Sequence, residues 1–204
     1  MNHSDWCALM ETVGFSENET TFEKLVQAYS EKHRGYHNSA HINAVLAEFA
    51  NVSNYADDKA AIELALWFHD AIYKIHSSTN EKDSADWARN FIVQCKGSEA
   101  FANLVDSLIM ATEHNFLPTK NDEKLIVDVD LSILGSSEAK YWEFEDSIRK
   151  EYKIIPWIIY RKKRIALLEY FLKREYVFSH EYFREKYEEK AKINLERAID
   201  KLKS

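Results

Sequence analysis

Helix-breaking residues are scarce in this chain, and their scarcity limits the folds that it can adopt. Only four glycines and two prolines occur among its 204 residues. Between them, apolar side chains recur every three or four residues, which is the period of a helix, and few stretches alternate as a half-buried strand would. The pattern predicts an all-α fold of about ten helices, over residues 4–13, 20–34, 39–53, 57–75, 80–96, 99–114, 122–134, 136–152, 156–175 and 179–202.

Capping residues stand at several of the expected helix starts. Asn38 precedes the third helix, Asp57 opens the fourth, Thr79 or Asn80 opens the fifth, and Ser179 opens the last. Side-chain oxygens of these residue types accept hydrogen bonds from the first backbone N–H groups of a helix. No repeat, low-complexity tract or linker interrupts the chain, and its length suits one domain with its own core. We therefore expect a single helical bundle over residues 1–204.

Composition and charge narrow the classes of function. The net charge is −7 and the pI is near 5.7, so a nucleic-acid polymer is not expected as a partner. A small phosphate ligand could still bind through local cations or a metal. No apolar run approaches the roughly 20 residues of a membrane span, and no signal peptide opens the sequence, so we expect a cytoplasmic protein with no membrane partner. The two isolated cysteines, Cys7 and Cys95, fit a reducing compartment and argue against a thiolate metal site.

Residues 64–73, LALWFHDAIY, place an imidazole beside a carboxylate at the end of an apolar segment. Burying either group without a partner is costly, so His69 and Asp70 each require one. In one interpretation, His69 is a core histidine that donates to a backbone carbonyl, with Asp70 in a nearby salt bridge. In the other, both side chains are ligands. Two adjacent polar residues in so apolar a setting weaken the first interpretation.

A second cluster of imidazoles lies in residues 31–49, EKHRGYHNSAHINAVLAEF. Asn38 as a helix cap would place His41 in the first turn of a helix and His37 just outside it. Neutral imidazole is the commonest protein ligand for transition metals, so His33, His37 and His41 suggest a metal site. The alternative is a solvated loop that carries histidines by chance.

Two aspartates, Asp128 and Asp130, interrupt the apolar run LIVDVDLSILG at residues 125–135. No lysine or arginine occurs between Lys124 and Lys140 to neutralise them. One aspartate could cap the helix that follows, and the other then needs a metal or an imidazolium. Together with the histidines, these carboxylates form a mixed nitrogen and oxygen set that suits Mn²⁺, Fe²⁺, Co²⁺, Ni²⁺ or Mg²⁺.

The order of a histidine, an adjacent His-Asp pair and a distal aspartate resembles the HD-domain metal-dependent phosphohydrolases. The chain is most similar to a subfamily of predicted HD-superfamily hydrolases with YHNxxHI, FHDxxY and DxDLxILG motifs. The resemblance covers about residues 25–200. The matching stretches are HRGYHNSAHI (33–42), LALWFHDAIY (64–73), NEKDSA (80–85), VDVDLSILG (127–135), IRKEY (148–152) and YRKKRIALLEYFLKREYVF (160–178).

The resemblance implies that His41, His69, Asp70 and Asp130 hold one or two divalent ions. Asp130 is preferred to Asp128 because the family's distal ligand is the aspartate that leads into the leucine. Asp128 would then orient a ligand imidazole from outside the ligand set. Asp70 could bridge two metals or accept a proton from the attacking water.

Further roles follow from the same resemblance. His37 and His114 would face the open side of the site, as substrate ligands or as ligands of a second metal. Asn80 and Glu81 match the motif after the His-Asp helix, where Glu81 would support the ligands and Asn80 could simply cap a helix.

Contacts to a phosphate ester would come from clustered cations and nearby rings. Arg149 and Arg164 lie within family-like motifs and are the expected phosphate ligands, whereas Lys162 and Lys163 are expected to solvate the surface. Tyr73 and Tyr152 could stack on a base or pack in the core.

The expected protein is a metal-dependent phosphohydrolase, monomeric or homodimeric, that acts on a nucleotide or another small phosphate ester. A non-catalytic metal- or nucleotide-binding sensor is one alternative. A di-iron oxygenase is another, and it would need additional ligands from His37, His76 and His114.

Overall fold

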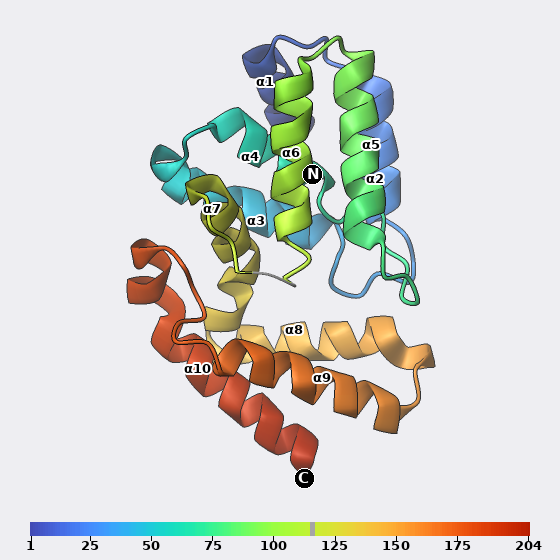
Figure 1. Cartoon of the computed structure of the whole chain (residues 1–204). Coiled ribbons are helices and arrows are strands. Elements are labelled where there is room, and N and C mark those ends of the chain that lie inside the picture. Colours follow the sequence, from blue (N-terminus) through green and yellow to red (C-terminus); the bar gives the residue numbers. More distant parts are fainter. Residues whose placement is uncertain (115–116) are drawn as a thin grey trace. The chain divides into compact units, whose positions relative to one another are not determined.

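The computed structural model describes residues 1–114 and 117–204 of the chain (Figure 1). These residues form ten α-helices and three short 3-10 helices and contain no strand, which confirms the predicted all-α class. The chain divides into two compact units, Met1–Val129 and Asp130–Ser204. A single domain over 1–204 stays a prediction.

The first unit is built around one buried helix. Its elements are α1 (His3–Val13), α2 (Glu19–Tyr29), α3 (Ser39–Val52), η1 (Ser53–Tyr55), α4 (Lys59–Phe68), α5 (Asn80–Gln94), α6 (Glu99–Ala111) and most of α7 (Asn121–Leu131). Helix α4 packs against α1, α3, α5 and α6, while α5 and α6 run side by side (Figure 1). From Ala61 to Phe68 every residue of α4 except Glu63 is buried, as its nearly uninterrupted apolar sequence predicts.

Helix α4 begins and ends at different residues from those predicted. Asp58, and not Asp57, caps its start, because the Asp58 carboxylate accepts a hydrogen bond from the N–H of Ala61. The backbone N–H groups of Asp57 and Asp58 both donate to the carboxylate of Asp122 on α7, at 2.8 and 2.9 Å. The helix ends at Phe68 rather than at residue 75. Helix α2 likewise ends at Tyr29, five residues short of the predicted end at 34.

The other predicted caps have mixed outcomes. Asn38 does cap α3, with its side chain accepting from the N–H of Ala40 at 2.9 Å. Thr79 precedes α5, but its side chain makes no capping hydrogen bond. His180 caps α10 in place of Ser179, because a ring nitrogen of His180 accepts from the N–H of Tyr182.

The second unit comprises η2 (Ser132–Gly135), α8 (Glu138–Glu151), η3 (Tyr152–Ile154), α9 (Trp157–Leu172) and α10 (Glu181–Lys203). Gly135 lets α10 approach η2 closely, since a Cβ at this position would stand 2.4 Å from Cβ of Tyr187. The amide of Asn194 on α10 donates to the carbonyls of Leu134 and Ser136 and fixes this contact. Across the ranges that the structure covers, no helix is long and apolar enough to cross a membrane.

Candidate metal centre

His69 and Asp70 lie in the turn that directly follows α4, and this turn is held by side chains from elsewhere in the first unit. The last carbonyls of a helix have no partner within it and must be satisfied from outside. Here the Trp67 carbonyl accepts from the hydroxyl of buried Tyr29 at 3.0 Å. The Phe68 carbonyl accepts from the N–H of Ala71 at 2.8 Å. The chain can therefore leave the helix at Phe68 without stranding buried polar groups.

Two imidazoles and one carboxylate converge at this turn. Nε2 of His41, from the first turn of α3, lies 3.2 Å from Nε2 of His69. Oδ2 of Asp70 lies 3.3 Å from Nε2 of His41 and 3.1 Å from Nε2 of His69. Both histidines are almost fully buried, and the Asp70 side chain is 15 % exposed. The three side chains thus form a nearly closed triangle of donor atoms at the edge of the core.

The ring of His69 is oriented by its other nitrogen. Nδ1 of His69 lies 2.9 Å from the carbonyl of Leu66, which can only accept, so Nδ1 carries the proton. In a neutral ring this leaves the lone pair on Nε2, the atom that points into the triangle. Metal-binding histidines are commonly oriented by such a hydrogen bond from the ring nitrogen that does not bind the metal.

The surroundings of Asp70 favour its ionised form. Burial by itself raises the pKa of this carboxyl. When the neighbouring imidazoles are protonated, the charges of His69 and His37, together with hydrogen bonds from His41 and His69, outweigh burial and hold the pKa of Asp70 well below its usual range. Asp70 is therefore a carboxylate near neutral pH, as a metal ligand or proton acceptor must be.

Asp130 reaches the same histidines from the last turn of α7. His41, His69 and Asp130 can each offer one ligand atom, and these three atoms all lie within 4.8 Å of one another. The boundary between the units falls just before Asp130, but α7 continues unbroken to Leu131. Its N-terminal end is bonded to the first unit through Asp122 and through the amide of Asn121, which donates to the carbonyl of Tyr55.

These side chains fit a divalent ion. Ligand atoms that share one ion at about 2.0–2.2 Å stand roughly 3.0–3.5 Å apart. The three sides of the His41, His69 and Asp70 triangle measure 3.1 to 3.3 Å. Imidazole nitrogen with carboxylate oxygen is a donor set that suits Mn²⁺, Fe²⁺, Co²⁺ or Ni²⁺, and carboxylate oxygen also suits Mg²⁺. The structure thus brings together His41, His69 and Asp70, and it groups Asp130 with the two histidines; these are the four residues that the resemblance implies as ligands.

Aromatic rings form the rim of the cluster. His37 stacks on Tyr73 with ring centroids 4.3 Å apart, and its ring meets that of His41 edge-on at 5.8 Å. Tyr36 packs against His41 at 4.7 Å. A ring nitrogen of His33 donates to the carbonyl of Tyr73 at 2.9 Å. His37 and Tyr73, both predicted site residues, are therefore close neighbours of the cluster.

Arg34 was not among the predicted site residues. This side chain is buried and donates to the carbonyls of His37 at 2.9 Å, Asp70 at 2.7 Å and Ala71 at 3.0 Å. It also bonds to Glu31 at 2.9 Å. Arg34 thereby ties the loop before α3 to the turn that carries His69 and Asp70. The signal in the sequence that could have identified it was an arginine between the histidines of the segment HRGYH at residues 33–37.

The remaining predicted residues of the first unit lie around this core. Asp128 is fully buried on α7. Glu81 is half-buried in the first turn of α5. Burial raises the pKa of its carboxyl, the nearby charge of Asp70 raises this pKa further, and His114 lowers it. His114 has a left-handed backbone, with φ of 59°, after the end of α6. Asn80 does not cap α5, because its amide bonds both the N–H and the carbonyl of Lys74.

The predicted phosphate ligands have partners within the second unit. Arg164 is buried and makes a two-point bond to Glu145, at 3.1 and 2.6 Å. Arg149 donates to the carbonyls of Tyr152 and Ile155 and stacks against the ring of Tyr160. Lys162 and Lys163 are exposed. These contacts give both arginines a role in holding α8, η3 and α9 together, and their contact with substrate stays a prediction, as does that of Tyr152.

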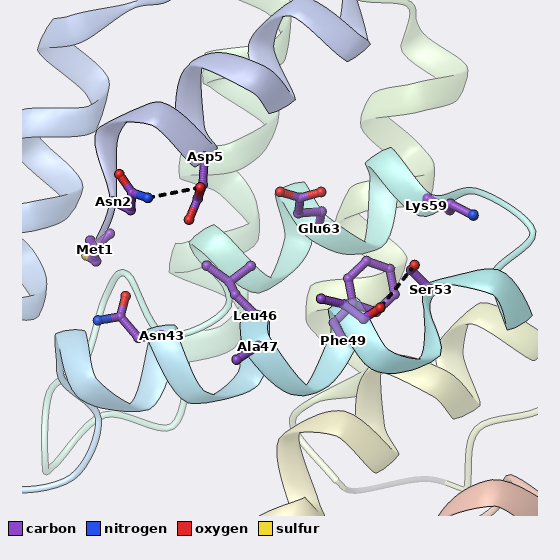
Figure 2. Close-up of a pocket in the computed structure, with 11 residues that line it drawn as sticks. Met1, Asn2, Asp5, Asn43, Leu46, Ala47, Phe49, Ser53, Lys59 and Glu63 are labelled. Atoms are coloured by element: carbon purple, nitrogen blue, oxygen red, sulfur yellow. Dashed lines mark hydrogen bonds between the residues drawn. The ribbon is translucent and has the colours of Figure 1, made fainter.

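A groove of about 750 Å³ opens between α1, α3 and α4 in the first unit (Figure 2). Figure 2 shows Asp5 and Glu63 above a floor that contains Leu46 and Phe49. None of the candidate metal ligands lines this groove. The groove is therefore distinct from the metal centre.

Comparisons of the chain with protein-family models, with curated proteins and with solved structures gave no match. The case for a metal centre thus depends on the geometry of His41, His69, Asp70 and Asp130 themselves.

Proposed function

We propose that the chain is a metal-dependent phosphohydrolase of the HD-domain type. The observation that carries the proposal is the buried triangle of His41, His69 and Asp70, with sides of 3.1 to 3.3 Å. The order of the motifs along the sequence supports the same assignment. The substrate class proposed is a nucleotide or another small phosphate ester.

The reaction proposed is hydrolysis of a phosphorus–oxygen bond. Water adds its hydroxyl to phosphorus, and its remaining proton ends on the leaving oxygen. When bound, a divalent ion lowers the pKa of a coordinated water and neutralises charge that develops on the phosphoryl oxygens.

The chain's own residues supply orientation and proton transfer. Asp70 is ionised, so its carboxylate can ligate the ion or accept a proton, and it cannot act as the acid. His37 is the candidate donor to the leaving oxygen, because it lies on the rim of the cluster and is stacked on Tyr73. Arg34 holds the backbone at His37 and at Asp70 by hydrogen bonds to both carbonyls.

The proposal is tested by hydrolysis assays on chelator-treated protein. The protein is reloaded with Mn²⁺, Co²⁺, Ni²⁺ or Mg²⁺ in turn and offered a panel of nucleotides and simple phosphate esters. We expect turnover of at least one ester that requires a metal and is lost in Asp70→Asn. Asp86→Asn is the matched control, since the Asp86 side chain on α5 is half-exposed and its ion pair is with Lys82. Metal binding without turnover of any ester would contradict the enzymatic assignment and favour a sensor.

A further inference from the structure

The turn between α8 and α9 exposes a group of apolar side chains. Ile154 is 60 % exposed, Trp157 48 %, Ile158 77 % and Ile159 50 %. They lie at the end of the helical hairpin that α8 and α9 form within the second unit (Figure 1). Four large apolar residues exposed within six positions are more than scattered surface exposure accounts for.

The same segment is strongly basic. Six of the fifteen residues 149–163 are lysine or arginine, and the one acid, Glu151, is buried. Exposed lysines frame the apolar group on both sides. We call the combined surface the basic apolar tip, and it consists of Lys150, Lys153, Ile154, Trp157, Ile158, Ile159, Lys162 and Lys163.

The lysines of the tip are not neutralised by the protein. Lys150, Lys153, Lys162 and Lys163 make no hydrogen bond or ion pair with any residue in the described ranges. Some exposed lysines elsewhere pair with nearby acids, as Lys82 does with Asp86, Lys120 with Glu123 and Lys203 with Glu169. Other exposed lysines in the described ranges, such as Lys24 and Lys190, also lack such a pair, so the distinctive feature of the tip is that four of these lysines cluster beside apolar side chains. A chain with net charge −7 therefore concentrates uncompensated positive charge at one apolar surface.

Helix α9 has two different faces at this end. Its inner face buries Tyr160, Arg164, Leu168 and Phe171 in the second unit. Ile158, Ile159, Lys162 and Lys163 fall within one arc of the opposite face, because residues three and four apart lie on the same side of a helix. The outer face therefore presents isoleucines in the first turn of the helix and lysines in the second, so that apolar and cationic groups lie side by side at the exposed end of α9.

We propose that the basic apolar tip docks on the surface of an anionic lipid bilayer. Tryptophan and isoleucine would enter the boundary between headgroups and acyl chains, while the lysines contact anionic headgroups. A second copy of this chain is a poorer partner, since an isologous contact would place the unpaired lysines of both copies against each other. The expectation of no membrane partner came from the lack of a spanning segment, and surface docking needs none.

Vesicle flotation with the full chain tests the proposal. We expect the protein to float with vesicles of equal parts phosphatidylcholine and phosphatidylserine, and not with phosphatidylcholine alone. Binding should weaken at high salt, because screening reduces the attraction of exposed charges. Lys162→Gln with Lys163→Gln should lower partitioning by about fivefold for each lysine lost. Ile158→Ser with Ile159→Ser should abolish it.

The matched control is Lys82→Gln with Lys120→Gln, which removes the same charge from exposed positions outside the tip. It should bind vesicles nearly as well as the parent. The proposal would be overturned if the protein did not bind phosphatidylserine vesicles at low salt. It would also be overturned if the control variant lost as much vesicle binding as Lys162→Gln with Lys163→Gln. The protein could instead form a dimer and fail to bind vesicles. If the double variant Ile158→Ser with Ile159→Ser then lost the dimer, the tip would be a self-association surface.

Discussion

The guanidinium of Arg34 donates a 2.7 Å hydrogen bond to the backbone carbonyl of Asp70, and the same nitrogen donates to the carbonyl of His37. One buried cation thus fixes the loop that leads to His41 and the turn that presents His69 and Asp70. Without it, the carbonyls of Asp70 and Ala71 in the turn after α4 would lose their guanidinium donor, and this link between the two segments that carry the candidate ligands would be absent.

Replacing Arg34 by lysine should weaken metal binding without removing a ligand. A lysine keeps the charge but cannot reproduce the planar set of donors that reaches three carbonyls. We expect the affinity for Mn²⁺ to fall roughly 10–100-fold, as for other residues that orient ligands. Calorimetric titration measures this affinity, with Arg197→Lys as the control because Arg197 is exposed and forms its ion pair with Glu138, on helices outside the metal centre. Equal affinities in Arg34→Lys and the parent would refute a positioning role.

The two aspartates of α7 should differ in their effect. Asp130 offers an oxygen to the group with His41 and His69, whereas Asp128 is wholly buried two residues earlier. We expect Asp130→Ala to lose the metal and Asp128→Ala to weaken its binding by about 10–100-fold. Metal content after gel filtration distinguishes them. The reverse ranking would show that Asp128 is the ligand.

The pair of Arg164 and Glu145 should stabilise the second unit. Both side chains are buried, and the hydroxyl of Tyr141 also donates to Glu145 at 2.8 Å. Arg164→Met leaves a buried carboxylate unpaired, so we expect a loss of about 3–5 kcal/mol in the free energy of unfolding. Adding Glu145→Gln should recover part of it in urea denaturation. If Arg164→Met instead unfolds like the parent but hydrolyses esters poorly, Arg164 contacts substrate.

Glu63 should make stability depend on pH. Burial, and then the nearby charge of Asp5, raises the pKa of this carboxyl. The folded state therefore binds its proton more tightly than the unfolded state, and the resulting stability is present in acid and lost as pH rises through the raised pKa. Glu63→Gln should melt at a higher temperature than the parent at neutral pH, with the difference closing below about pH 4.5. Glu23→Gln, at an exposed position of α2, is the matched control.

Local patterns were enough to predict the all-α fold, because helical periodicity is visible in the sequence itself. The ligand set came from the resemblance of the motifs and stays a prediction. The ends of α2 and α4 were wrong because hydrogen bonds between distant residues set them. Tyr29 satisfies the carbonyl of Trp67, and Arg34 satisfies those of Asp70 and Ala71. The ion pair of Arg164 with Glu145 was not predicted for a similar reason, since the two residues lie nineteen positions apart.

The most direct test is metal titration of His69→Ala beside His76→Ala, which removes an exposed imidazole seven residues later. Calorimetry on chelator-treated protein measures the affinity for Mn²⁺ and Co²⁺, and circular dichroism verifies that helix content is unchanged. We predict that His76→Ala binds Mn²⁺ and Co²⁺ with the affinity of the parent and that His69→Ala binds neither ion. Full occupancy in His69→Ala would contradict the assignment of the metal centre.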